Sequence, residues 1–113
     1  MDNQAQAQAD QIVVSQQDRI AVIRLSDPKR RNAMSLEMRE QCVAALRAME
    51  ESGEVDAVII TGEGDKAFSA GADLDELARR TVSGELSTRA QLRRELTKLL
   101  ESMRLPTIAA ING

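Results

Sequence analysis

The segment Gly62-Glu63-Gly64-Asp65-Lys66-Ala67-Phe68-Ser69-Ala70-Gly71-Ala72-Asp73-Leu74 joins an apolar run to a helix start. The run before it, residues 57–60, is apolar on both faces, as expected of a buried parallel strand. After it, Asp73 and Glu76 have the spacing of a capping box. The segment is therefore predicted to be a glycine-rich loop at the C-terminal end of a strand, where open α/β folds bind ligands.

The backbone around Ala72 is a candidate anion site. Its N–H groups would lie at a helix N-terminus, unpaired within the helix and at the positive end of its dipole. Such donors suit a phosphate or a developing oxyanion. A P-loop is not indicated, because Gly-Lys-Ser/Thr is missing at the helix start, and the glycine spacing differs from the dinucleotide fingerprint. On these residues alone, a plain strand-to-helix connection remains the alternative.

Strand and helix patterns alternate along the chain. Residues 1–11 are polar and low in complexity, which predicts a disordered tail before a domain at 12–113. The predicted elements are strands at 12–15 and 20–25 with their turn at 16–18, a helix from the N-cap Ser35 to Ser52, a strand at 57–60, a short helix at 73–80, a loop at 81–87, a long helix ending before Pro106 and a buried strand at 107–111. This order predicts the α/β class, with parallel buried strands and covering helices.

Composition excludes several functions. The net charge is −3 without a basic stripe, so we expect no nucleic-acid partner. The chain has no histidine and one cysteine, which excludes a Ser-His-Asp or Cys-His site and a structural zinc site within it. Cys42 falls in a helical pattern and is predicted to be a core thiol. We expect no membrane association, since no apolar run approaches spanning length, and a cytoplasmic location, since the N-terminus does not resemble a signal peptide.

Four segments, in order, resemble the crotonase superfamily, the enoyl-CoA hydratase/isomerase family. They are residues 20–25 (its second strand), 28–34 (Pro-Lys-Arg-Arg-Asn-Ala-Met, its Pro-x-x-x-Asn-Ala-Leu segment), 68–74 (its oxyanion loop) and 105–113 (the stretch before its second glycine-rich loop). The resemblance covers nearly all of residues 12–113. It implies the N-terminal part of a ββα spiral, incomplete because a buried final strand would lack a sheet neighbour and a covering helix.

The resemblance also implies the chemistry. The Ala72 N–H would be one of two donors to the oxygen of a thioester enolate, with the second donor after Asn112-Gly113. The implied substrate-binding residues are Lys29, Arg31, Ala33, Ala70, Ala72, Asp73 and Leu74. The basic residues among them, with Arg30, are candidates for the nucleotide phosphates. The Ala33 backbone would lie along the pantetheine or adenine, and Ala70 and Leu74 would flank the thioester. The acidic residues Asp73, Asp75 and Glu76 are interpreted as the N-cap and first turn of the predicted helix at 73–80, rather than as acid/base groups.

The implied partner is an acyl-CoA thioester, whose CoA is part of the substrate, with no separate cofactor and no metal. The implied assembly is a homotrimer or a dimer of trimers. The implied enzyme is a lyase or isomerase of the enoyl-CoA hydratase/isomerase type; dehalogenases and decarboxylases of the family share this portion. Because the catalytic acids would lie beyond residue 113, we expect the isolated chain to be inactive. Two alternatives stay open: a non-catalytic remnant that binds CoA or a subunit, and an unrelated small α/β anion-binding module.

Overall fold

The computed structural model describes residues 11–72 and 84–113. In chain order the elements are β1 (Ile12–Gln17), β2 (Ile20–Leu25), the 3-10 turn η1 (Pro28–Arg30), α2 (Leu36–Ser52), β3 (Ala57–Gly62), α4 (Gly84–Ser102) and β4 (Thr107–Ala110). Residues 1–10 of the predicted tail and the predicted helix at 73–80 lie outside the described residues.

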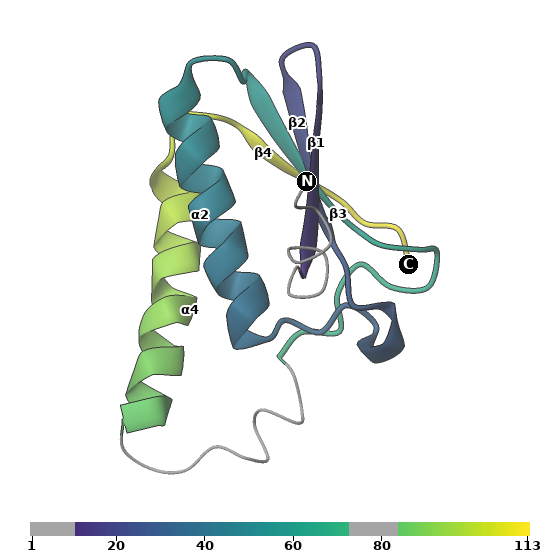
Figure 1. The fold of residues 1–113 in the computed structure, drawn as a ribbon, viewed down its shortest axis with the longest axis vertical. Helices are drawn as coiled ribbons and strands as arrows, with labels where there is room; N and C mark the ends of the chain where they lie inside the picture. Colours follow the sequence, from purple (N-terminus) through teal and green to yellow (C-terminus); the bar gives the residue numbers. More distant parts are fainter. Residues whose placement is uncertain (1–10, 73–83) are drawn as a thin grey trace, which may run out of the picture.

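The strands form one sheet in the order β1-β2-β3-β4. β1 and β2 are an antiparallel hairpin, whereas β3 runs parallel to β2 and β4 runs parallel to β3. Figure 1 shows α2 and α4 side by side on one face of this sheet. The predicted α/β class, with parallel strands and covering helices, is confirmed.

Helix α2 begins and ends as its sequence predicts. The Ser35 Oγ accepts a hydrogen bond from the Met38 N–H at 3.1 Å, and Gly53 ends the helix with a φ of 72° that favours glycine. The buried face of α2 carries Met38, Cys42, Val43, Leu46 and Met49. Facing it across the core are the fully buried Ile23 and Val58 of the sheet. Burying a large apolar side chain of this kind contributes roughly 1.5–3 kcal/mol to folding.

Two predicted boundaries were wrong. The hairpin turn lies at Asp18–Arg19 rather than at 16–18, because Gln16 and Gln17 still pair with Ala21 and Ile20 in the antiparallel ladder. Helix α4 begins at Gly84, within the segment predicted to be a loop. A glycine at the first residue of a helix avoids most of the entropic penalty that it carries in the interior.

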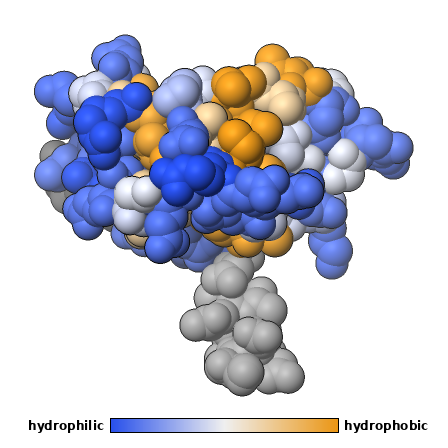
Figure 2. Space-filling model, turned by 90° about the horizontal axis from the view of Figure 1, so that it is seen from above, coloured by the Kyte–Doolittle hydropathy of each residue, from blue (hydrophilic) through white to orange (hydrophobic). Residues whose placement is uncertain are grey.

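The predicted strand at 107–111 is confirmed at Thr107–Ala110, but the prediction that it is buried was wrong. β4 pairs with β3, and no strand among the described residues pairs with its other edge. Ile108 is 51% exposed and Ile111 is 72% exposed. Beside this edge, an apolar hollow of about 250 Å³ opens between the helices and the sheet, lined in part by Leu96, Leu100 and Ile108. Figure 2 shows apolar groups at the surface among hydrophilic ones.

Candidate functional site

The candidate site lies where the loop after β3 meets the segment after β2. Because β2, β3 and β4 are parallel, their carboxyl ends come together at one end of the sheet. In Figure 1 the C-terminus of the chain lies beside the loop that follows β3. Ligands of open α/β sheets bind at this end.

Asn32 anchors the segment after β2. Its side chain is buried, and both Arg31 and Asn32 adopt left-handed backbone conformations, with φ of 55° and 57°. The Asn32 Oδ1 accepts from the Asp27 N–H at 2.8 Å. Its Nδ2 donates to the carbonyl oxygens of Glu63 at 3.1 Å and Ala67 at 2.9 Å. The two Nδ2 bonds thus join the two segments, and the Oδ1 bond holds the segment after β2 in its turn.

Residues 69–72 run alongside residues 31–34. The Ala70 N–H donates to the Arg31 carbonyl oxygen at 2.9 Å, and the Met34 N–H donates to the Gly71 carbonyl oxygen at 2.6 Å. Met34 and Ala72 form an isolated parallel β-bridge. Gly71 has a φ of 95°, a backbone conformation that residues with a side chain rarely adopt.

This pairing sets the direction of the Ala72 N–H. The Gly71 carbonyl and the Ala72 N–H belong to one trans peptide group, so they point in opposite directions. Since the Gly71 oxygen faces Met34, the Ala72 N–H faces away from that segment. Within residues 11–72 and 84–113 it has no hydrogen-bond acceptor. A half-buried, fixed donor of this kind is available to an anionic oxygen.

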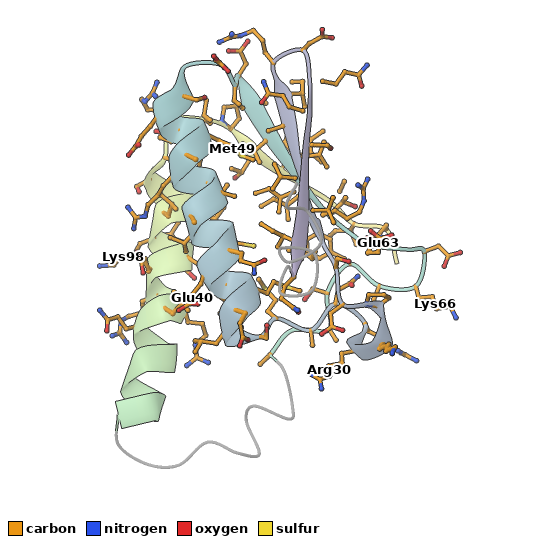
Figure 3. All side chains as sticks on the ribbon, in the orientation of Figure 1. Arg30, Glu40, Met49, Glu63, Lys66 and Lys98 are labelled. Atoms are coloured by element: carbon orange, nitrogen blue, oxygen red, sulfur yellow. The ribbon has the colours of Figure 1, made fainter. Side chains whose placement is uncertain are left out.

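A polar hollow of about 240 Å³ lies beside this pairing. Its lining residues are Pro28, Arg31, Asn32, Glu63, Gly64, Asp65, Lys66 and Ala67. Figure 3 shows the labelled Arg30, Glu63 and Lys66 at this end of the molecule, with Lys66 pointing away from the sheet. Two basic and two acidic side chains therefore border the hollow, and a ligand there would be held by individual contacts rather than by a net positive field.

The structure brings some of the predicted site residues together. Arg31 borders the hollow, and Ala70 is exposed on the loop that leads to Ala72. Lys29 is exposed on η1 but is not among the residues that line the hollow. Ala33 is buried, and its N–H donates to the Arg30 carbonyl oxygen at 3.1 Å. Asp73 and Leu74 lie outside the described residues.

Sequence reasoning did not assign a role to Asn112. Its Oδ1 accepts from the Gly62 N–H at 3.2 Å, and its Nδ2 donates to the carbonyl oxygens of Gly62 at 3.0 Å and Gly64 at 2.7 Å. The side chain pairs with the end of β3 as a further strand residue would. An Asn-Gly pair after a strand is a turn signal, and a turn signal does not reveal such distant contacts.

In the part of the chain that the structure describes, there is no group of three or more acidic, cysteine or histidine side chains that could hold a metal ion. The described helices also include none that is long and apolar enough to cross a membrane.

Comparison with known proteins supplies the family. Residues 15–113 match the model of the enoyl-CoA hydratase/isomerase family. A probable enoyl-CoA hydratase of Mycobacterium tuberculosis is 41% identical over 107 residues, which are 95% of this chain and 41% of that protein. A crotonyl-CoA hydratase of Syntrophomonas wolfei is 32% identical over 90% of this chain and 39% of its own length.

Solved structures agree with this match. An enoyl-CoA hydratase from Bacillus anthracis superposes with a TM-score of 0.85 and 32% identity, over 92% of this chain and 40% of that one. The chain thus spans about two fifths of the length of the relatives that it matches. The match excludes the alternative of an unrelated anion-binding module. The chain belongs to the enoyl-CoA hydratase/isomerase family.

Proposed function

We propose that this chain forms part of the active site of an enzyme that acts on acyl-CoA thioesters, as an enoyl-CoA hydratase does. In this proposal the Ala72 N–H donates a hydrogen bond to the thioester carbonyl oxygen while that oxygen becomes an enolate. The observation that carries the proposal is the 2.6 Å bond from the Met34 N–H to the Gly71 oxygen, which turns the Ala72 N–H away from residues 31–34.

The fixed direction of this donor is what makes it useful. A donor that is already aimed at the oxygen needs no reorganisation when charge develops, so it stabilises the transition state more than the ground state. Removal of one oxyanion donor costs about 2.7–4 kcal/mol in other enzymes. The left-handed Gly71 and the bridge to Met34 hold the Ala72 peptide in place before the ligand arrives.

The CoA arm is proposed to lie along residues 29–33 and the hollow. Arg31 and Lys66 border that hollow from opposite segments and would bind the nucleotide phosphates. Lys29 and Arg30 are exposed on η1, just before Arg31 in the sequence, and are further candidates for these phosphates. The family resemblance suggests that the Ala33 backbone lies along the ligand. Ala70, exposed on the loop, would flank the thioester together with Leu74.

The remaining chemistry is proposed to come from other residues of the protein. The family resemblance puts the second oxyanion donor after Asn112-Gly113 and the acid/base carboxylates further along. These 113 residues would then bind an acyl-CoA without turning it over. For the whole protein, the resemblance suggests a homotrimer or a dimer of trimers, a cytoplasmic location, and no cofactor apart from the CoA of the substrate.

Titration with acetoacetyl-CoA tests the proposal. This β-keto thioester forms an enolate that absorbs in the near ultraviolet, so a site that stabilises the enolate raises that absorbance at constant pH. We expect the rise with acetoacetyl-CoA, competition by CoA, and no competition by ATP at equal concentration. Binding of CoA without the enolate signal would favour the non-catalytic alternative. Equal competition by ATP and CoA would contradict recognition of an acyl-CoA.

A further inference from the structure

Two asparagine side chains hold residues 62–67 from opposite sides. Asn32 donates from one side to the carbonyl oxygens of Glu63 and Ala67. Asn112 bonds from the other side to both backbone groups of Gly62 and to the Gly64 carbonyl oxygen. We call residues 62–67 the clamped loop. It separates β3 from the segment that carries Ala72, and it forms one wall of the polar hollow.

The end of β4 lies in direct backbone contact with this loop. β4 pairs with β3 only as far as Ala110, and the Asn112 carboxamide continues the pairing at Gly62. A Cβ on Gly113 would lie 2.5 Å from the Lys66 carbonyl carbon and 2.6 Å from the Ala67 nitrogen. The backbone after β4 therefore touches the loop without an intervening side chain.

We propose that Asn112 is a positioning residue that acts with Asn32 to fix the clamped loop, and through it the hollow and the Ala72 peptide. An asparagine suits this role because one carboxamide supplies both an acceptor and two donors. The Asn112 side chain uses both capacities on one loop, whereas a carboxylate at the same place could only accept. The consequence for ligand binding rests on the proposed function; the clamp itself does not.

The test compares Asn112→Asp with the matched control Thr61→Val in the full 113-residue chain. Thr61 also bonds across the same two strands, from its Oγ1 to the Ala110 carbonyl oxygen at 2.8 Å, and this bond does not involve the clamped loop. Hydrogen–deuterium exchange is measured on peptides that cover residues 62–72, with residues 12–25 of the β1–β2 hairpin as the internal reference.

We expect Asn112→Asp to raise exchange over residues 62–72 about tenfold, because two donated hydrogen bonds are lost. Exchange over 12–25 should stay unchanged, and Thr61→Val should leave residues 62–72 unchanged. Unchanged exchange in Asn112→Asp would overturn the clamp. So would a rise of the same size over 12–25, or the same rise in Thr61→Val.

Titration with acetoacetyl-CoA supplies the second measurement. We expect Asn112→Asp to weaken its binding by about tenfold and Thr61→Val to leave it unchanged. If Asn112→Asp exchanges faster over residues 62–72 but binds acetoacetyl-CoA as tightly as wild type, the positioning role is overturned. If the wild-type chain fails to bind acetoacetyl-CoA, the proposed function fails, and the exchange measurement still decides whether the clamp exists.

Discussion

The Ser69 hydroxyl donates a hydrogen bond to the Asn32 carbonyl oxygen at 2.8 Å, across 37 positions of sequence. The same Oγ accepts a hydrogen bond from the Gly71 N–H at 3.1 Å. One hydroxyl therefore ties the loop to the segment after β2 and also bends the loop at the left-handed Gly71. Ser69 stabilises the turn that aims the next peptide, although it lies three residues before Ala72.

Replacement of Ser69 by alanine should lower the free energy of unfolding. Two hydrogen bonds are lost at a half-buried position, so we expect a loss of about 1–2 kcal/mol. Urea denaturation, followed by far-ultraviolet circular dichroism, measures it. Ser69→Thr keeps the hydroxyl and should lose less. Equal losses in the two variants would contradict a role for the hydrogen bonds.

The sequence predicted those features that depend on near neighbours. The Ser35 cap bonds three residues ahead, and Gly53 needs only its own backbone angle, so both could be identified from local chemistry. The roles of Asn32 and Asn112 could not. Their carboxamides bond to backbone groups 31 to 50 positions away, and which backbone lies within reach depends on the complete sheet.

The error at β4 has a different physical reason. An apolar run such as residues 107–111 indicates that a strand can be buried on both faces, but it does not indicate what covers it. Among the described residues the outer edge of β4 is uncovered, so Ile108 and Ile111 are exposed. Similarly, the loop motif predicts a role for Ala72, but only the bond between Met34 and Gly71 gives the direction of its N–H.

Glu50 should make the stability depend on pH. Its carboxylate accepts hydrogen bonds from the Arg104 N–H at 2.7 Å and the Leu105 N–H at 3.2 Å, which join the end of α2 to the segment before β4. The Arg104 N–H is the largest cause that holds the pKa of Glu50 below its ordinary 4.5, and desolvation opposes it. A lowered folded pKa means that Glu50 stabilises the fold above pH 4.5, and that this contribution is lost as the pH falls through the folded value.

Thermal unfolding of Glu50→Gln between pH 7 and pH 3 checks this prediction. We expect a lower Tm than wild type near neutral pH and a difference that shrinks in acid, because the protonated Glu50 of the wild type then resembles glutamine. Glu51→Gln is the control, because Glu51 is the next residue along the helix and is exposed. A difference in Tm that stays constant over this pH range would contradict the assignment.

The β4 edge should cause the isolated chain to self-associate. An unpaired strand edge invites pairing with another chain, and the apolar Ile108 and Ile111 are exposed beside it. Ile111→Lys should lower the concentration-dependent association measured by sedimentation velocity, because a charged edge residue disfavours pairing. Ala48→Lys, at an exposed position of helix α2 and so on neither edge strand, is the control. A monomer with a sharp, reversible, two-state melt, or an equal effect of both lysines, would contradict this prediction.

Ala72 offers the most direct test of the oxyanion assignment. Proline has no N–H, so Ala72→Pro removes the proposed donor. That N–H bonds to no acceptor among residues 11–72 and 84–113, so the substitution removes no donor that the described fold uses. We expect acetoacetyl-CoA to lose its enolate absorbance with Ala72→Pro, while CoA alone still binds. In a catalytically active form of the protein, kcat should fall on the order of 10²–10³.

Ala72→Gly is the matched control, because it removes the methyl group and keeps the N–H. It should retain most of the enolate signal, with a modest loss from the greater freedom of two consecutive glycines at 71 and 72. Circular dichroism of both variants establishes that the sheet and helices persist. The comparison separates the backbone donor from the side chain, since only the proline variant lacks the N–H. If Ala72→Pro folds and still gives the full enolate signal, the Ala72 N–H is not an oxyanion donor.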